Sequence, residues 1–403
     1  MKRLLHIFIL AALLLTPGCT REIPVGTDSF LLQFVMPEGF RPGAYYSGQT
    51  VQLNGTLSYE FQTDVRGMVS VGSVIPGIYD IITHMELSGS AYKAMLAEPV
   101  SLEDNARVII GVSLMNQRIF KAEDLQIALT AAVQKDLLIS KIYYSGTRDL
   151  MDRTYTSDGY VEIFNNSDET VYMDGRYLAL AESVSPAAYP ASENPDSIYL
   201  RQVCRFPGAG TDYPVAPGGS MVIAARSARN HLESASDSVD LSDADFEVKQ
   251  TEGSGNPDVT MLPFIHNSTT VAYFNLLSGG PNAVILFETD EDVSTWPKVY
   301  QRGKTSGELF LRIHKKYVTD GIECLKKPAQ TDPDVTSKRL QGDIDAGYAV
   351  INSVNGYIHE SVERKVSSVS GGRCYLTDTN NSSADCVICT DPTPRVYDKE
   401  GLL

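Results

Sequence analysis

The chain has 403 residues, of which 50 are acidic and 34 are Lys or Arg, so its formal net charge is −16 at pH 7. That length suffices for two or three domains of ordinary size. Nucleic acids and anionic lipid surfaces are bound through basic patches, and a strongly acidic chain repels both. The composition therefore argues against a nucleic-acid-binding protein and favours an acidic, soluble body.

The first twenty residues indicate export. Lys2 and Arg3 precede an apolar run over residues 4–15, which is too short to cross a bilayer because a spanning helix needs about 20 apolar residues. Residues 1–18 are therefore predicted to be a signal peptide. Gly18 followed by Cys19 resembles a bacterial lipobox, and the resemblance implies that Cys19 is lipidated and becomes the first residue of the mature chain. The alternative is an ordinary secreted protein that is cleaved near Gly18.

Residues 19–28 are interpreted as a lipidated tether, and from Ser29 the pattern becomes that of β-strands. Short alternating apolar runs are separated by Gly, Pro, Asn and Asp, as in "FLLQFVM", "TVQLNGTLSYEFQTD", "GMVSVGSVIPGIYDIITHMEL" and "RVIIGVSLM". No helical period is sustained for three turns in this half. The spacing predicts a β-sandwich over residues 29–133.

A motif in this half resembles a known family. In "FQTDVRGMVSVGSVIPGIYDIITHM", the residues Asp64, Gly67, Pro76, Gly77 and Tyr79 are similar to the signature of carboxypeptidase-regulatory-like, transthyretin-like domains. The resemblance implies a structural or binding spacer, and it brings no catalytic residue to any position of this chain.

The remainder resembles a lamin-tail domain, which is an Ig-like sandwich. The matching segments are residues 139–146, 160–165, 171–178 and 215–224, followed by "YVTDGIEC", "GDIDAGYAV", "ESVERKV" with Arg364, and "DTNNSSADCVICTDPTPR". Insertions at residues 183–196 and 228–258 interrupt the match. We therefore predict an all-β protein of two sandwich domains, the second over residues 134–395, with a short tail over 396–403.

The stretch "VEIFNNSDETVYMDG", residues 161–175, raises the question whether its carboxylates and amides form an active site or a turn. The lamin-tail resemblance places Glu162 at an inward-facing strand position and Asn165 at a hairpin corner. Asn, Ser and Asp bond to their own backbone and tolerate left-handed geometry. We therefore expect a structural corner.

Five cysteines follow Cys19, and an odd number in an exported protein leaves at least one free thiol if the others pair. Two of them have C-x-x-C spacing but lie on a predicted strand, where they point to opposite faces. No second such pair and no nearby histidine completes a zinc site. We expect buried free thiols, with a disulfide from Cys374 to one of that pair as the alternative; the sequence leaves the pairing open among Cys204, Cys324, Cys374, Cys386 and Cys389.

Catalytic motifs are lacking. The histidines beyond the signal are scattered, without H-E-x-x-H or H-x-x-x-H, at positions His84, His231, His266, His314 and His359. There is no G-x-S-x-G elbow, no phosphate-binding loop and no G-x-G-x-x-G opening a helix. We assign no catalytic residue, no metal ligand and no cofactor, and the binding residues are left unidentified.

Two features allow a functional and a structural interpretation. The acidic run with Asp237, Asp240, Asp243 and Asp245 could surround a calcium ion, but it lacks the glycine of a calcium loop, and a solvated loop that caps a short helix is preferred. The single tryptophan, Trp296, could be an exposed interface anchor. A half-buried core residue is the interpretation that we favour.

The two domains behind a lipobox are similar to a family of uncharacterised exported lipoproteins of Gram-negative bacteria, some of which are encoded near outer-membrane uptake receptors. The resemblance implies an outer-membrane location and favours the side that faces the cell exterior, with the periplasmic side as the open alternative. The implied partners are the membrane, through the anchor, and an outer-membrane receptor or another envelope protein, but no nucleic acid.

We expect a binding module that is not an enzyme and whose two insertions carry the binding residues. Residues 228–258 are accordingly expected to be removable without loss of the fold. A purely structural envelope component and a hydrolase with residues distant in sequence are the alternatives. The oligomeric state is left open.

Replacing Cys19 by Ser tests the anchor. The variant is expected to be released from the membrane fraction, because acyl chains would supply the membrane affinity. Fractionation of cells that express the variant or the wild type measures this. A variant that still sediments with membranes would refute the lipoprotein interpretation.

Overall fold

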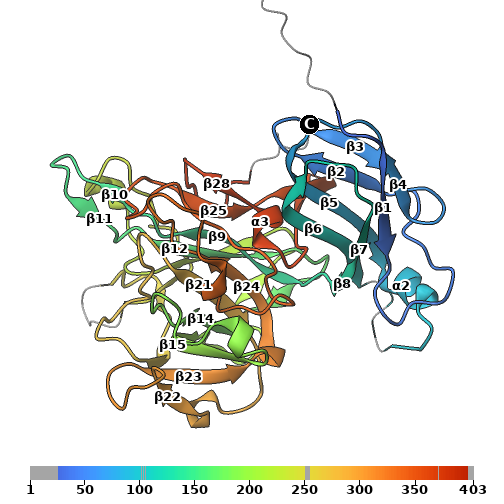
Figure 1. Cartoon of the computed structure of the whole chain (residues 1–403). Coiled ribbons are helices and arrows are strands. Elements are labelled where there is room, and N and C mark those ends of the chain that lie inside the picture. Colours follow the sequence, from blue (N-terminus) through green and yellow to red (C-terminus); the bar gives the residue numbers. More distant parts are fainter. Residues whose placement is uncertain are drawn as a thin grey trace, which may run out of the picture. The chain divides into compact units, whose positions relative to one another are not determined.

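The computed structural model describes residues 26–100, 102, 104, 106–249, 255–370 and 372–397 (Figure 1). The signal peptide, Cys19 and most of the tether lie outside the described residues. In the described part strands predominate, which confirms the all-β prediction. The helical pieces are short: α2 (Gly89–Met95), α3 (Ser382–Asp385), η1 (Ala191–Glu193), η2 (His231–Glu233), η3 (Val293–Thr295), η4 (Lys315–Tyr317) and η5 (Val335–Ser337). None of the described helices has the length and apolar character needed to span a membrane.

The chain forms two compact units. The first holds residues 43–83, 114–129 and the described residues up to 38, and the second holds the rest. The domain boundaries predicted from the sequence stay a prediction.

The first unit is built around β1 (Phe30–Val35). This strand pairs with β4 (Met68–Val71) in antiparallel and with β7 (Leu125–Ala128) in parallel orientation. Alternate residues Phe30, Leu32 and Phe34 are buried, so one face of β1 packs on a core. A further strand, β2 (Thr50–Asn54), pairs with β3 (Tyr59–Gln62) and β5 (Gly77–Ser88).

The residues of the transthyretin-like motif have structural roles. The Asp64 carboxylate accepts hydrogen bonds from the backbone N–H groups of Arg66 and Met68 and so closes the turn. Gly67 occupies this turn at a φ of 74°, which favours glycine. Tyr79 is buried, and its hydroxyl donates to the Ile75 carbonyl at 2.6 Å. The motif therefore fixes a turn and a core contact.

Two seven-stranded sheets dominate the second unit. The first has the order β19-β18-β17-β12-β9-β25-β28. Its strands are β9 (Leu137–Tyr143), β12 (Tyr160–Asn165), β17 (Ser220–Ala224), β18 (Phe246–Glu247), β19 (Thr260–Met261), β25 (Ser361–Arg364) and β28 (Cys386–Cys389). β18 pairs in parallel with β17 and β19, and the other neighbours are antiparallel.

The second sheet has the order β22-β23-β15-β14-β21-β24, with β20 paired to β15. Its strands are β14 (Tyr177–Ala181), β15 (Ser197–Arg205), β20 (Phe264–Asn267), β21 (Asn282–Phe287), β22 (Lys298–Tyr300), β23 (Leu309–His314) and β24 (Val318–Cys324). The remaining ladders join β6 (Arg107–Ile119) to β8 (Thr130–Val133), β10 (Thr147–Arg148) to β11 (Thr154–Tyr155), β13 (Val171–Tyr172) to β16 (Pro214–Val215), and β26 (Val366–Ser370) to β27 (Arg373–Leu376).

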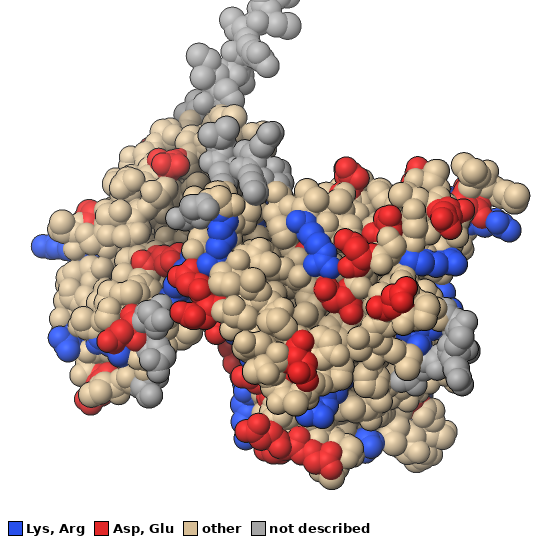
Figure 2. Space-filling model, turned by 180° about the vertical axis from the view of Figure 1, so that it is seen from behind, with Lys and Arg blue, Asp and Glu red and all other residues tan. Residues whose placement is uncertain are grey.

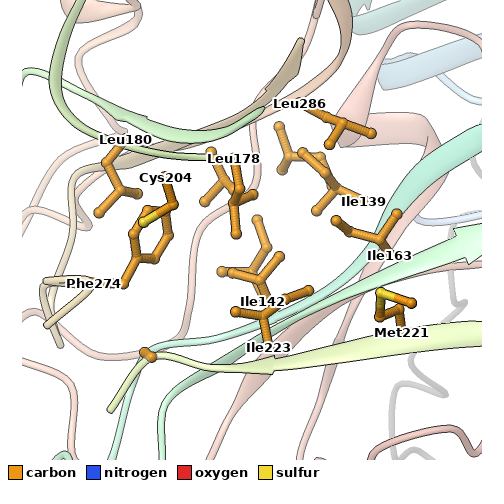
Figure 3. Packing of buried hydrophobic residues seen from close by; sticks show 14 of the residues in the cluster. Ile139, Ile142, Ile163, Leu178, Leu180, Cys204, Met221, Ile223, Phe274 and Leu286 are labelled. Atoms are coloured by element: carbon orange, nitrogen blue, oxygen red, sulfur yellow. The ribbon is translucent and has the colours of Figure 1, made fainter. Parts of the chain in front are cut away.

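The main core lies between these two sheets. Ile139, Ile142 and Ile163 of one sheet face Leu178 and Leu286 of the other (Figure 3). The outer faces of the central strands are covered as well, since every residue of β9, β12, β14 and β21 is buried. Strands buried on both faces read as near-continuous apolar runs rather than alternating ones.

A buried arginine joins the two sheets. From β25, Arg364 pairs with Asp320 of β24 at 2.8 Å, and with Asp378 at 3.1 Å and Asp385 at 3.4 Å. Asp320 also accepts a hydrogen bond from the backbone N–H of Ile139 in β9. Burial lowers the pKa of Arg364, but the carboxylates outweigh burial and raise it, so the guanidinium stays charged.

A second buried polar cluster holds the carboxyl end of the chain. Lys141 lies across from Glu162 and Glu363 in the register of three neighbouring strands, and it pairs with Glu363 at 2.8 Å. Its ammonium group also donates to the Thr393 carbonyl at 2.9 Å. Glu162 accepts from the hydroxyl of Tyr397 at 2.8 Å. Residues 393–397 are thereby fixed to the first sheet as a C-terminal strap.

The corner after β12 is structural, as the sequence predicts. The Asn165 side chain accepts from the backbone N–H and hydroxyl of Ser167 and donates to the carbonyls of Glu169 and Val215. Glu162 is buried. The exposed Asp168 is bound by Arg373 and Tyr375. The polar residues of the corner therefore satisfy backbone groups and bind a neighbouring hairpin.

The insertion over residues 228–258 is only in part the solvated loop that the sequence suggests, since Asp237, Asp240 and Asp243 are exposed but the apolar residues between them are not. Val239, Leu241 and Ala244 are buried against Tyr143 and Tyr160 on the outer face of the first sheet. The strand β18 extends that sheet, and Phe246 lies in the main core. The expectation that this insertion can be removed is therefore wrong, because its removal would expose one face of the sheet.

A buried carboxyl lies beneath the same insertion. Asp158 is fully buried, and one of its oxygens accepts from the Tyr143 hydroxyl at 3.0 Å. The other oxygen has no hydrogen-bond partner within the described part of the chain. Burial raises the pKa of Asp158 to about 7, although the Tyr143 hydroxyl and the Arg226 charge oppose the rise.

Truncating Leu241 to Ala tests whether the insertion belongs to the core. We expect a loss of about 2–5 kcal/mol in the free energy of unfolding, because a fully buried side chain is removed. Leu232→Ala is the control in the same insertion, since Leu232 is 45% exposed, and it should change stability by no more than about 0.5 kcal/mol. Urea unfolding measures both, and equal small losses would contradict the structure.

Replacing Asp158 by Asn tests the buried carboxyl. A pKa above the ordinary 3.8 means that the folded chain holds this proton more tightly, so the stability gained is present at low pH and is lost as pH rises from about 4 to 7. Asp158→Asn should therefore gain stability relative to the wild type between pH 5 and pH 8. Asp332→Asn, on an exposed carboxyl, should show no such gain. If the free energy of unfolding differs between the variant and the wild type by the same amount at pH 5 and at pH 8, the raised pKa of Asp158 is excluded.

Candidate binding site

The cysteines are free thiols in the described structure. Cys204, Cys324, Cys374 and Cys386 are buried and Cys389 is partly buried, which agrees with the free-thiol interpretation; the alternative disulfide of Cys374 is absent from the described residues. Burial raises the pKa of the Cys204 and Cys324 thiols well above their usual range. Such thiols are poor nucleophiles and poor metal ligands.

The residues considered for metal binding have other partners. Asp240 caps the backbone and hydroxyl of Ser242. Asp245 accepts from the Val222 N–H and from Arg395, to which Asp243 is also paired. Over the ranges that the structure describes, no group of three or more His, Cys, Asp or Glu side chains is placed to hold a metal ion.

His231 also has a structural role. It is buried, with Nδ1 2.7 Å from the Tyr155 hydroxyl and Nε2 3.0 Å from the Ser227 carbonyl. Burial lowers its pKa to about 4, so the ring is neutral at pH 7. Both ring nitrogens are engaged, which leaves neither for a substrate.

An open cleft of about 1090 Å³ lies on the second unit. One wall is the segment from Glu169 to Tyr177, which includes β13 and the start of β14. The other wall is residues 288–294, which follow β21 and lead into η3. The antiparallel pairing of β14 with β21, in which Tyr177 is opposite Phe287, brings these distant segments together.

The cleft is acidic. Two guanidinium groups, of Arg176 and Arg205, are outnumbered by seven carboxylates, those of Asp136, Glu169, Asp174, Glu288, Asp290, Glu291 and Asp292. Figure 2 shows that acidic side chains gather in patches on the face of the molecule that it draws. The potential in a concave acidic surface favours a positively charged partner.

Four of these carboxylates shape the walls. Asp174 accepts hydrogen bonds from the backbone N–H groups of Gly210, Asp212 and Tyr213. Burial raises its pKa, but these three donors prevail and the pKa lies below its usual range. The other three are held by neighbouring side chains: Glu288 by Arg176, Asp292 by Ser294, and Glu291 by both Trp296 and Tyr317.

The other three carboxylates are free to bind. Asp136, Glu169 and Asp290 are exposed, and no hydrogen bond or ion pair engages their side chains within the described structure. They come from three separate segments of the chain. Their spacing around one cleft is therefore a property of the fold.

Stacked aromatic rings stiffen the wall of the cleft. Tyr177 stacks on Phe287 with 4.6 Å between ring centroids, and Phe287 lies 6.4 Å from Trp296, which in turn contacts Tyr317 at 4.8 Å. Trp296 is partly buried against the core, which confirms that interpretation. Hydrogen bonds, chiefly from the Tyr317 hydroxyl, lower the pKa of Glu291 and keep it ionised.

The polar groups that line this cleft are chiefly carboxylates and hydroxyls. Its described lining contains no histidine, lysine or cysteine, and its one serine, Ser294, donates to Asp292 within a helix cap. Nothing there pairs a nucleophile with a base in the way that acyl or phosphoryl transfer needs. Fixed carboxylates can instead attract and orient ammonium or guanidinium groups.

Sequence reasoning assigned binding to the two insertions and missed this cleft. Neither insertion lines it. The signal that could have indicated it is "ETDEDVSTW", residues 288–296, in which four carboxylates precede the only tryptophan of the sequence.

Comparison with known proteins gives a fold and no activity. A family model described as "Protein of unknown function (DUF4876)" matches residues 216–393. The crystal structure of a DUF4876 family protein from Bacteroides thetaiotaomicron is 22% identical, covers 93% of this chain and 98% of its own, and has a TM-score of 0.58. The crystal structure of a DUF3823 family protein from Bacteroides ovatus is 11% identical, covers 49% of this chain and 98% of its own, and has a TM-score of 0.16. No curated protein matches the chain.

Proposed function

We propose that the chain is a non-catalytic envelope protein that works by binding, and that the acidic cleft receives a basic segment of a protein partner. The observation that carries the proposal is the set of three exposed carboxylates, Asp136, Glu169 and Asp290, around one open cleft with no partner among the described residues.

The rigidity of the walls supports a binding role. Asp174 ties the loop at residues 210–213 through three backbone hydrogen bonds, and the ring of Tyr177 is stacked. A pre-formed site loses less conformational entropy on binding than a loop that must be ordered. Opposite charges across such an interface accelerate encounter and select partners.

Attachment to a membrane is the second part of the proposal. The lipobox resemblance at Cys19 supports a lipid anchor, and the lipoprotein resemblance supports an outer-membrane location facing the exterior. An outer-membrane uptake receptor with a basic segment is the partner that we favour. The two alternatives are a purely structural envelope component and a hydrolase.

Neutralising the three free carboxylates together tests the cleft. The variant with Asp136→Asn, Glu169→Gln and Asp290→Asn should bind its co-purifying membrane partner about tenfold more weakly, because rim charges contribute up to about 1 kcal/mol each. Binding is measured with the partner identified by pull-down from native membranes and then purified. Raising the salt concentration should weaken wild-type binding and have little effect on the variant.

The matched control changes three exposed carboxylates outside the cleft by the same chemistry: Glu98→Gln, Asp258→Asn and Asp332→Asn. It makes the same change in net charge and should bind as the wild type does. Equal binding by both triple variants would remove the cleft from the proposal. Turnover by the wild type in a screen of esters, phosphoesters, peptides and glycosides would overturn the non-catalytic role.

A further inference from the structure

The hairpin of β10 and β11 exposes large apolar side chains at its tip. Figure 1 shows this hairpin projecting at one end of the second unit. Leu150 is 89% exposed and Met151 is 75% exposed. Side chains of this size and exposure bury almost nothing, so their apolar character contributes little to the fold.

The shape of the tip does not depend on these two side chains. The Asp149 carboxylate accepts from the backbone N–H groups of Met151 and Arg153, each at 2.9 Å, and from the Arg153 guanidinium at 2.7 Å. The Asp149 N–H donates to the Arg153 carbonyl, which closes the turn. The fold therefore builds a fixed turn that presents Leu150 and Met151 outward.

Two further apolar side chains lie on the segments that contact the base of this hairpin. Leu232, 45% exposed, follows His231, which is bonded to Tyr155 of β11. Ile358, 38% exposed, follows Tyr357, whose ring lies 5.7 Å from the Arg148 guanidinium. We call Leu150, Met151, Leu232 and Ile358 the apolar tip.

The charges of the hairpin neutralise one another. Arg148 pairs with Asp152 at 3.2 Å, and Arg153 pairs with Asp149 at 2.6 Å. The hairpin therefore brings no unpaired charge to a surface that it approaches, and the long arginine side chains can keep their guanidinium groups in water while their stems contact an apolar layer.

We propose that the apolar tip inserts into the interfacial region of a neutral, zwitterionic lipid surface. Its apolar groups are most exposed at the end of a projection and less so at its base, which suits shallow insertion. A protein interface instead buries about 800 Å² on each partner, which calls for a broader contact than a two-residue projection. The net charge of −16 disfavours an anionic lipid surface.

This contact goes beyond the proposed function and does not depend on the acidic cleft. Insertion of two apolar side chains is weak and reversible on its own, as is that of a single acyl chain. Its effect is to orient a chain that is held near a membrane by other means.

Vesicle flotation tests the proposal on the chain without its first 19 residues, which keeps every described residue and lacks the acylation site. The probe is a phosphatidylcholine vesicle. The wild type should float with the vesicles, and the double variant Leu150→Ser, Met151→Ser should bind about a hundredfold more weakly. Replacing roughly a third of the phosphatidylcholine by anionic phosphatidylglycerol should weaken wild-type binding at low salt, because the acidic chain is repelled by the anionic surface.

The matched control is Val65→Ser, which changes a valine that is 77% exposed elsewhere on the chain and should bind as the wild type does. Leu150→Trp should show fluorescence quenching by brominated acyl chains, and Val65→Trp should not. A wild type that stays unbound, or a double variant that floats equally well and melts normally, would overturn the proposal. In that case we would expect the apolar tip to insert into a pocket of a protein partner.

Discussion

The buried charge of Arg364 is the constraint on which the second unit depends. A guanidinium inside a protein is tolerated only if carboxylates and carbonyls surround it, and removing one partner leaves a buried charge that costs about 3–5 kcal/mol. Its partner Asp320 stands on the opposite sheet and also binds the backbone of β9. The two sheets therefore cannot slide without breaking this pair. The positions of β14 and β21, and so the walls of the acidic cleft, follow from that fixed arrangement.

Burial of both faces of the central strands decides where function can lie. With β9, β12, β14 and β21 covered on each side, the central strands offer no open face to a partner in the described part of the chain. What remains are the segments between strands, and both proposed surfaces are of this kind. The acidic cleft is formed by turns beside β14 and β21, and the apolar tip by a turn that Asp149 closes. Binding residues commonly lie on loops that a rigid scaffold of strands holds in position.

Much of the fold was predictable from the sequence because its signals are local. Alternating apolar runs indicated the strands, and Asn165 marked a corner through the bonds that its own side chain makes. The insertion over residues 228–258 was misjudged because its apolar residues, such as Leu241 and Phe246, are spaced singly among Ser and Asp and bury themselves only against another segment. The acidic run at residues 288–292 could have indicated one wall of the cleft, but the pairing of Tyr177 with Phe287 that brings both walls together is a long-range property of the sheet.

The C-terminal strap has a consequence for the order of synthesis. Lys141, near the start of the second unit, donates to the carbonyl of Thr393, which is 252 residues further along the chain. During translation or translocation, Lys141 and Glu162 cannot be enclosed until residues 393–397 are available to contact them. Contacts of such long sequence separation form slowly, because a large loop must close first. The second unit is therefore expected to complete its fold only after residues 393–397 have emerged, and a chain truncated before the strap would be a substrate for quality-control proteases.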